Sequence, residues 1–273
     1  MKKITRITTQ KKRKNRYNIF LDDGNDEYYG FSVDEAVLIE YKLQKNLELE
    51  DSMIDELIQK DDLHKSYTLT INFLSYRMRT KKEIHDYLVK KEVDEEHIKQ
   101  IMDRLLTEGL LDDRMFADSF VRTRIQTSIK GPMLVKKELI EKGVSVTIAS
   151  EAIKEYTFDV QMEKIEKWID KKMNKQGRDS FKKQVQQLQV TLMQKGFEQD
   201  VIKEAVSGLG DEKDDDAEWT AIISQGEKLL RKHKTKSSGY ALRNKVKEGL
   251  YRKGFGIDLI NKFLDRDEDE DEF

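Results

Sequence analysis

The sequence predicts a mainly α protein, with tandem three-helix modules in an elongated array preceded by a small N-terminal β-hairpin-plus-helix domain. First, a stretch of similar residues recurs four times, at 88–101, 139–152, 192–205 and 250–263. Second, a single proline among 273 residues leaves long uninterrupted segments, which favours helices over a turn-rich β fold. Third, charged residues make up 38% and hydrophobic residues 37%, a balance typical of an extended helical protein with much surface per residue.

The repeated stretch predicts the end of one helix and the turn into the next. It begins with a leucine; a glycine stands four residues later in three copies, and an apolar residue always follows. In a Schellman cap the glycine is the left-handed residue past the helix end, and the apolar residue packs back on the leucine. The predicted caps are Gly143, Gly196 and Gly254. The first copy has Glu92 instead, which predicts either backbone strain or a different turn.

Helices are predicted on both sides of each cap. After the cap, apolar residues three positions apart give the next helix one buried face. The middle helices have start signals, because Thr80 and Glu83 fit a capping box and Pro132 fits the first helical position. Asp112 fits the N-cap of an upstream helix. Upstream helices are expected at 66–77, 113–126, 160–173 and 218–232.

The start of the chain differs from the repeats. Residues 1–31 are rich in β-formers, and "DDGN" at 22–25 is a hairpin turn signal. A helix is expected from about Val33 to Asn46, followed by an acidic helical connection. The predicted division is an N-terminal domain at 1–62, modules at 63–111, 112–157, 158–210 and 218–265, an acidic linker at 211–217 and an acidic tail at 266–273.

What the sequence lacks argues against several classes of protein. With no cysteine there are no disulfides or thiolate metal sites, which is compatible with a reducing cytoplasm. No apolar run predicts a signal peptide or a membrane span. No glycine-rich phosphate loop occurs, the four histidines share no motif, and the acidic run at 211–218 lacks the fixed geometry of a metal site. We therefore expect no catalytic residues, no cofactor and no bound metal.

Basic side chains are the remaining candidates for a functional surface. They recur near the turns of successive modules, which suits a long, interrupted basic track for nucleic acid or for a polymer that carries it. For any single residue, an ordinary solvated helix face is the competing interpretation. No base-reading motif accompanies them, so sequence-specific recognition is not predicted. The candidate binding residues are Arg77, Arg79, Lys81, Lys82, Arg122, Arg124, Lys130, Arg178, Lys182, Lys183, Arg231, Lys232, Lys234, Arg243 and Lys245.

The middle of the chain resembles a known family. In order, "FLSYRMRTKKEIHDYLVKK" at 73–91, "LLTEGLLDDRMFADSFVRTR" at 105–124 and "KGPMLVKKELIEKGV" at 130–144 resemble the RecX family of regulators of the RecA recombinase. The similarity is strongest over residues 66–156, and the remaining segments look like the long RecX forms of low-GC Gram-positive bacteria. The resemblance implies tandem three-helix modules and a cytoplasmic, non-enzymatic protein that binds RecA filaments and inhibits the recombinase.

Two other functions stay open at this point. A nonspecific DNA-binding or architectural protein shares the basic track but predicts tight, salt-dependent binding to bare DNA without a recombinase. A helical scaffold for another protein is the third interpretation. On the RecX interpretation we expect a monomer, with no membrane contact, whose partners are the RecA filament, single-stranded DNA and double-stranded DNA.

Overall fold

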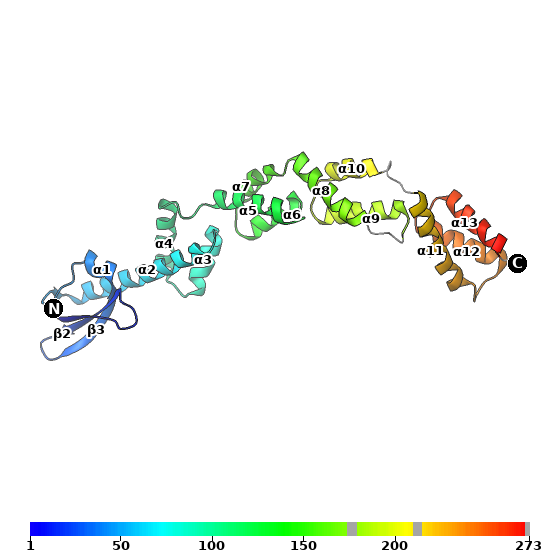
Figure 1. Cartoon of the computed structure of the whole chain (residues 1–273). Helices are drawn as coiled ribbons and strands as arrows, with labels where there is room; N and C mark the ends of the chain where they lie inside the picture. The colour runs from blue at the N-terminus through cyan, green and yellow to red at the C-terminus, as the bar shows by residue number, and fades with distance from the viewer. Residues whose placement is uncertain (174–178, 210–214, 271–273) are drawn as a thin grey trace. The chain divides into compact units, whose positions relative to one another are not determined.

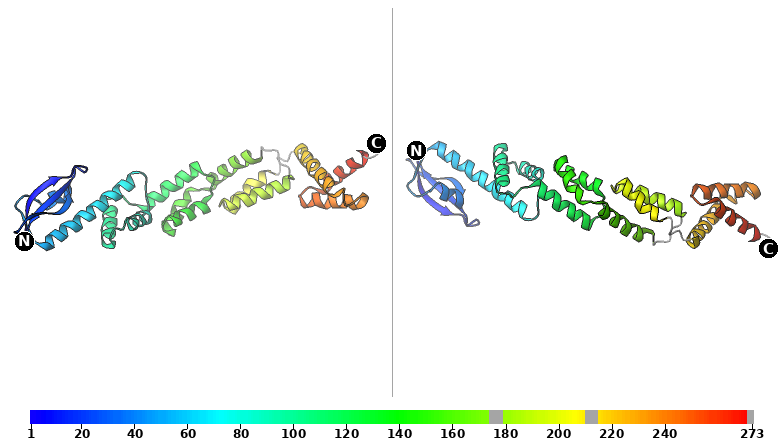
Figure 2. Two further views of the ribbon diagram at one scale, coloured as in Figure 1. Left: turned by 90° about the horizontal axis from the view of Figure 1, so that it is seen from below. Right: turned by 90° about the horizontal axis from the view of Figure 1, so that it is seen from above.

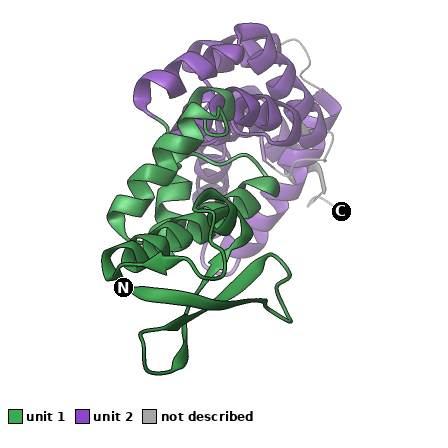
Figure 3. Ribbon diagram, turned by 90° about the vertical axis from the view of Figure 1, so that its left-hand side faces the viewer, with its two compact units in different colours: residues 1–116, 142–144 green, residues 117–141, 145–273 purple. Residues whose placement is uncertain are grey.

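Figure 1 shows the computed structural model of the chain, which describes residues 1–173, 179–209 and 215–270. Arg178, most of the predicted linker and the end of the predicted tail lie outside these residues. The chain divides into two compact units, which Figure 3 colours separately. One contains residues 1–116 and 142–144, and the other contains residues 117–141 and 145–273.

The first unit begins with a small antiparallel sheet. Its strands are β1 (Lys2–Thr9), β2 (Arg16–Asp22), β3 (Glu27–Asp34) and β4 (Glu48–Leu49), in the order β3-β2-β1-β4. Alternate residues such as Ile19 and Leu21 are buried, because successive side chains of a strand point to opposite faces. They pack with Ile54 and Leu57 of helix α2 (Asp51–Ser75), which runs beside the sheet in both views of Figure 2.

The helix expected from Val33 to Asn46 is wrong in extent. Helix α1 covers only Glu35–Glu40, starting after the N-cap Asp34. The chain then passes through two left-handed residues, Lys42 at φ 49° and Asn46 at φ 73°. The Asn46 N–H donates to the Ile4 carbonyl at 2.8 Å, which brings β4 alongside β1. Pairing with the sheet therefore overrides the helical pattern of this segment.

Helix α2 is also longer than the sequence predicts. The helix expected at 66–77 begins at Asp51 and ends at Ser75, so the expected boundary between 62 and 63 falls inside it. Its first half packs in the sheet core through Leu57. Its second half places Leu63, Tyr67 and Ile71 against the core of α3 (Lys81–Lys90) and α4 (Glu95–Thr107). One helix thus contributes to two cores.

The later helices form the repeats. The three helices at 112–157 are α5 (Asp113–Thr127), α6 (Pro132–Glu141) and α7 (Val146–Ala152), followed by a short 3-10 helix at Ile153–Glu155. The next two sets are α8 (Phe158–Met173), α9 (Phe181–Gln194) and α10 (Gln199–Ser207), then α11 (Asp215–His233), α12 (Gly239–Arg252) and α13 (Ile257–Glu270). The repeated leucines anchor each core, since all four are fully buried: Leu88, Leu139, Leu192 and Leu250.

Three of the four repeated turns have the hydrogen bond of a Schellman cap. The N–H of the apolar residue donates to the leucine carbonyl from Val93 to Leu88 at 3.2 Å, from Phe197 to Leu192 at 3.3 Å and from Phe255 to Leu250 at 3.3 Å. The turn glycines have φ values of +90° at Gly143, +82° at Gly196 and +89° at Gly254. Glu92 adopts the same left-handed conformation at φ +58°, so the first copy keeps the turn and bears its strain.

Candidate binding surface

Some of the predicted basic residues of the first unit pair with a carboxylate and others do not. Arg77 is one that does. Its guanidinium donates to both Glu83 oxygens, at 3.0 and 3.1 Å, and the Lys142 ammonium reaches the same carboxylate at 3.0 Å. Burial alone would raise the pKa of Glu83, but these two cations outweigh it and hold the pKa below its usual value. Glu83 also completes the capping box with Thr80 at the start of α3. Arg77 therefore holds a helix start in place.

Arg79 belongs to the other group. Its guanidinium lies 3.9 Å from the centre of the Phe73 ring, and Phe73 stacks on Tyr87 with the ring centres 4.0 Å apart. Burial, and then repulsion from Arg77, lowers the pKa of Arg79. Its Nε is buried without a hydrogen-bond partner, and it forms no ion pair with any side chain that the structure describes. Glu83 acts on Arg79 only from a distance, so a guanidinium held on an aromatic face without a direct ion pair is suited to receive an external phosphate or carboxylate.

In the second unit most of the predicted arginines form an ion pair with a carboxylate. Arg122 binds both oxygens of Glu155, with Nη2 at 2.9 Å from Oε1. Arg124 and Lys130 share Glu138. Counting both units, the predicted cations with a carboxylate partner are Arg77, Arg122, Arg124, Lys130, Lys183, Arg231 and Arg243. Exposed ion pairs are weak, about 0–1 kcal/mol, yet each partner lowers the local positive potential.

Five further lysines of the predicted set have no carboxylate partner among the described residues. Lys81, Lys182, Lys232 and Lys234 are exposed and form no ion pair within the described part of the chain. Lys245 donates to the Ser237 hydroxyl at 2.7 Å instead of a carboxylate. The predicted track is therefore reduced to separate groups of uncompensated charge, one of them at the end of α11 and in the turn after it.

The N-terminal domain carries a further group of cations that the sequence analysis does not include among the candidate binding residues. The structure places Lys11, Lys12, Arg13 and Lys14 in the loop between β1 and β2, where all four are exposed. None forms an ion pair with a described residue. The signal was the run "QKKRKN" itself, set between two strands of alternating pattern. We call this loop, residues 10–15, the basic hairpin loop.

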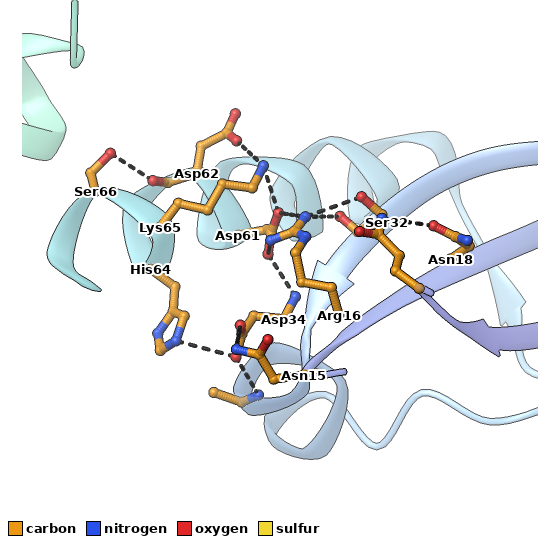
Figure 4. A network of polar contacts seen from close by, with 12 residues as sticks. Asn15, Arg16, Asn18, Ser32, Asp34, Asp61, Asp62, His64, Lys65 and Ser66 are labelled. Atoms are coloured by element: carbon orange, nitrogen blue, oxygen red, sulfur yellow. Dashed lines mark hydrogen bonds and ion pairs between the residues drawn. The ribbon is translucent and has the colours of Figure 1, made fainter. Parts of the chain in front are cut away.

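A buried ion pair holds the end of this loop, as Figure 4 shows. Arg16 is the first residue of β2, and its guanidinium lies 2.8 Å from Asp61 of α2. Asp61 also accepts from the Asp34 N–H at 2.7 Å and from Lys65 at 2.8 Å. Burial would raise the pKa of Asp61, but hydrogen bonds from Arg16, Lys65 and the Asp34 N–H outweigh it, so the pKa lies below its usual value. The C-terminal end of the basic hairpin loop is therefore fixed to helix α2.

The described part of the chain offers neither a metal-binding cluster nor a membrane-spanning helix. Over the described ranges, no three His, Asp or Glu side chains are grouped so that they could hold a metal ion. Within the same ranges, no helix has the length and apolarity needed to cross a membrane.

The repeats and the exposed cations together define a class: a modular helical protein with basic patches. Family comparisons identify it further. Residues 2–50 match the regulatory protein RecX N-terminal domain, 67–105 match the first three-helix domain of RecX, 112–153 match the second, and both 159–206 and 216–264 match the third. The chain belongs to the RecX family of regulatory proteins.

Whole-chain relatives agree with the domain matches. A regulatory protein RecX of Oceanobacillus iheyensis is 56% identical over 97% of this chain and 98% of its own length. One of Bacillus cytotoxicus is 40% identical over 96% of each chain. A crystal structure of regulatory protein RecX has 28% identity and a TM-score of 0.54, covering 97% of this chain and all of its own. That of RecX from Lactobacillus salivarius has 35% identity and a TM-score of 0.53, covering 55% of this chain and 98% of its own.

Proposed function

We propose that this protein regulates a RecA recombinase, as an inhibitor that binds the filament of RecA on single-stranded DNA. Binding would lower ATP turnover and strand exchange, and so restrain homologous recombination and DNA repair in the cytoplasm. The observation that carries the proposal is membership of the RecX family along nearly the whole chain. In this proposal the protein acts as a monomer without a catalytic site of its own.

Electrostatics support a filament as the partner. Uncompensated cations lie in the basic hairpin loop, at Arg79, at Lys182, and at Lys232 and Lys234 around the end of α11. A regular polymer of protein and DNA offers phosphates and acidic side chains at repeated intervals. Several weak contacts on linked modules add through their effective concentration, so none of them has to be strong.

The decisive measurement is the ATPase rate of the cognate RecA on excess single-stranded DNA, titrated with this protein at fixed salt. Excess DNA prevents simple competition for the template from resembling regulation. We expect the rate to fall at ratios well below one protein per RecA. An unchanged rate, with the protein still bound to bare DNA, would favour a nonspecific DNA-binding function instead.

A matched pair of variants tests the electrostatic part. Lys232→Gln with Lys234→Gln removes two uncompensated charges, whereas Lys154→Gln with Lys167→Gln removes two charges already paired with Glu151 and Glu163. Both pairs change the net charge equally. We expect the first pair alone to raise the concentration needed for half-inhibition. Equal behaviour of the two pairs would show that overall charge, and not these lysines, sets the affinity.

A further inference from the structure

The repeated lysine–glycine turn makes a second kind of contact. In each case the carbonyl just before the turn glycine accepts a hydrogen bond at the start of the middle helix one repeat earlier. The three contacts are Thr80 Oγ1 to the Lys142 carbonyl at 2.6 Å, Gly131 N to the Lys195 carbonyl at 2.7 Å, and Ser180 Oγ to the Lys253 carbonyl at 2.6 Å. The first lies within the first compact unit, to which residues 142–144 belong, and the other two lie within the second.

Close approach explains why these positions are glycine. A Cβ added at Gly143 would lie 2.3 Å from the Lys82 Cβ, and one at Gly196 would lie 2.7 Å from the Leu134 nitrogen. At Gly254 the nearest atom is the Ser180 hydroxyl oxygen, at 2.7 Å. Non-bonded atoms do not tolerate such distances, so a side chain at any of the three displaces the contact.

Left-handed backbone alone does not demand glycine in this turn. Glu92 occupies the equivalent position of the first copy with a full side chain and φ +58°. It is exposed, and no earlier repeat stands before it. The exception therefore coincides with the one copy that has no preceding middle helix to contact.

An acidic side chain completes two of the contacts. The first N–H of the middle helix donates to Asp113 from Lys81 at 2.9 Å, and to Glu218 from Phe181 at 2.6 Å. Asp113 and Glu218 are buried although both are charged residue types. Both acids belong to the first helix of the following repeat, α5 or α11.

Of the three middle helices that are followed by another repeat, the remaining one, α6, starts with Pro132, which has no N–H to donate. The first helix of the following repeat, α8, there carries a buried neutral residue, Gln161, in place of an acid. Its side chain donates to the Tyr156 carbonyl at 3.2 Å and accepts from the Glu198 N–H at 3.3 Å. The acidic side chain is therefore absent from α8, where the middle helix before it has no N–H for that side chain to accept from.

We infer that the lysine–glycine turn is a joint between modules. The turn glycine, together with the acidic residue of the first helix where one is present, packs each module against the preceding one, at the start of that module's middle helix. Gly196, Gly254 and Ser180 are then positioning residues of the second unit. They fix where the basic groups of successive modules lie. The consequence for binding rests on the proposed function, because a preordered array loses less entropy on a filament than freely jointed modules do.

The joint between α9 and the turn after α12 is tested on the protein alone. Since the chain has no cysteine, Gln186→Cys and Lys228→Cys give a unique spin-label pair on exposed sites of α9 and α11. We expect a narrow distance distribution that broadens in Gly254→Ala. The control is Gly109→Ala, which has the same kind of left-handed strain at φ +68° but no atom within 4 Å of the added Cβ. An unchanged distance distribution in Gly254→Ala would overturn the inference that this turn is a joint.

A second series separates the joint from helix capping. Ser180→Ala removes a cap and a joint bond, whereas Ser145→Ala removes a cap only. We expect the spin-label distance distribution to broaden in Ser180→Ala and to stay narrow in Ser145→Ala. It should also stay narrow in Ser180→Thr, because Thr80 holds the equivalent position in the first module and makes the same bond. Equal effects of the two alanines would overturn the inference.

Filament binding is measured afterwards with the same full-length variants. We expect Gly254→Ala to raise the dissociation constant by about tenfold, the order of magnitude for a partial loss of effective concentration. Broadened distances with unchanged affinity would refute the positioning role. Failure of the unmodified protein to bind filaments would refute the proposed function. The distance measurements on the free protein would still show whether the turn holds successive modules together.

Discussion

Replacing Asp61 by asparagine tests the buried pair that holds the basic hairpin loop. Asp61 accepts from both terminal nitrogens of Arg16, from Lys65 and from the Asp34 N–H. An asparagine oxygen can keep the Asp34 bond, but its amide N–H group then faces the Arg16 guanidinium. Breaking a buried ion pair costs about 3–5 kcal/mol. Arg16 still donates to Ser32, at 3.0 and 3.2 Å, so we expect the low end, about 3 kcal/mol.

Hydrogen exchange in the full-length protein resolves this effect, because a chain with several domains need not unfold in one step. A loss of about 3 kcal/mol corresponds to a fall of roughly 100-fold in the protection of the β2 and β3 amides. The matched control is Asp62→Asn, because Asp62 is half-exposed and its carboxylate pairs only with Lys65 among the residues that the structure describes. That change should cost less than about 1 kcal/mol. Equal loss of protection in both variants would refute the reasoning.

The same pair makes a prediction for acid. The pKa of Asp61 is lower in the folded state than in the unfolded chain. Its contribution to stability is therefore complete above the unfolded value, about 4, and is lost as the pH falls through the folded value. We expect the N-terminal sheet of the unmodified protein to lose protection below about pH 4, and that of Asp61→Asn to lose less over this range.

Three further predictions concern the binding groups and the second unit. Changing Lys11, Lys12, Arg13 and Lys14 to glutamine should lower the salt slope of single-stranded DNA binding by up to about 3 if each contacts one phosphate; an unchanged slope would place the loop off the DNA. Deleting residues 211–273 should weaken filament binding sharply, and unchanged affinity would contradict multivalent contact. Burial raises the pKa of Tyr156 to about 12, so its share of stability should be lost as the pH rises from about 10 through that value; Tyr156→Phe should lack this dependence in an alkaline unfolding series.

Much of the fold was predictable because its signals are local. The glycine turn, the capping box at Thr80 and the proline at the start of α6 each depend on a few neighbouring residues. The family resemblance and the three-helix modules are confirmed by the family models. The extents of α1 and α2 were missed, because β4 pairs with a strand more than forty residues away and α2 serves two cores.

The candidate surface was less predictable. Sequence gives the number of cations but not which of them meet a carboxylate after folding. Arg122 and Glu155, for example, are 33 residues apart and become bidentate partners only through the packing of helices. In contrast, the basic hairpin loop was open to prediction, since a run of cations at a hairpin tip has no acidic neighbours in sequence. Its role in binding remains a prediction, as do those of the other candidate residues.

Glu92 offers the sharpest distinction between strain and contact in the repeated turn. The first module needs no joint, because the continuous helix α2 already links its core to that of the N-terminal domain. Glu92 therefore has only the left-handed strain, about 1–2 kcal/mol for a residue with a Cβ. Glu92→Gly relieves this strain, offset by the greater freedom of glycine in the unfolded chain. We expect a gain of up to about 1 kcal/mol, measured as slower hydrogen exchange in α3 and α4. Faster exchange would mean that the Glu92 side chain makes a stabilising contact, and that its difference from the three glycines has another origin.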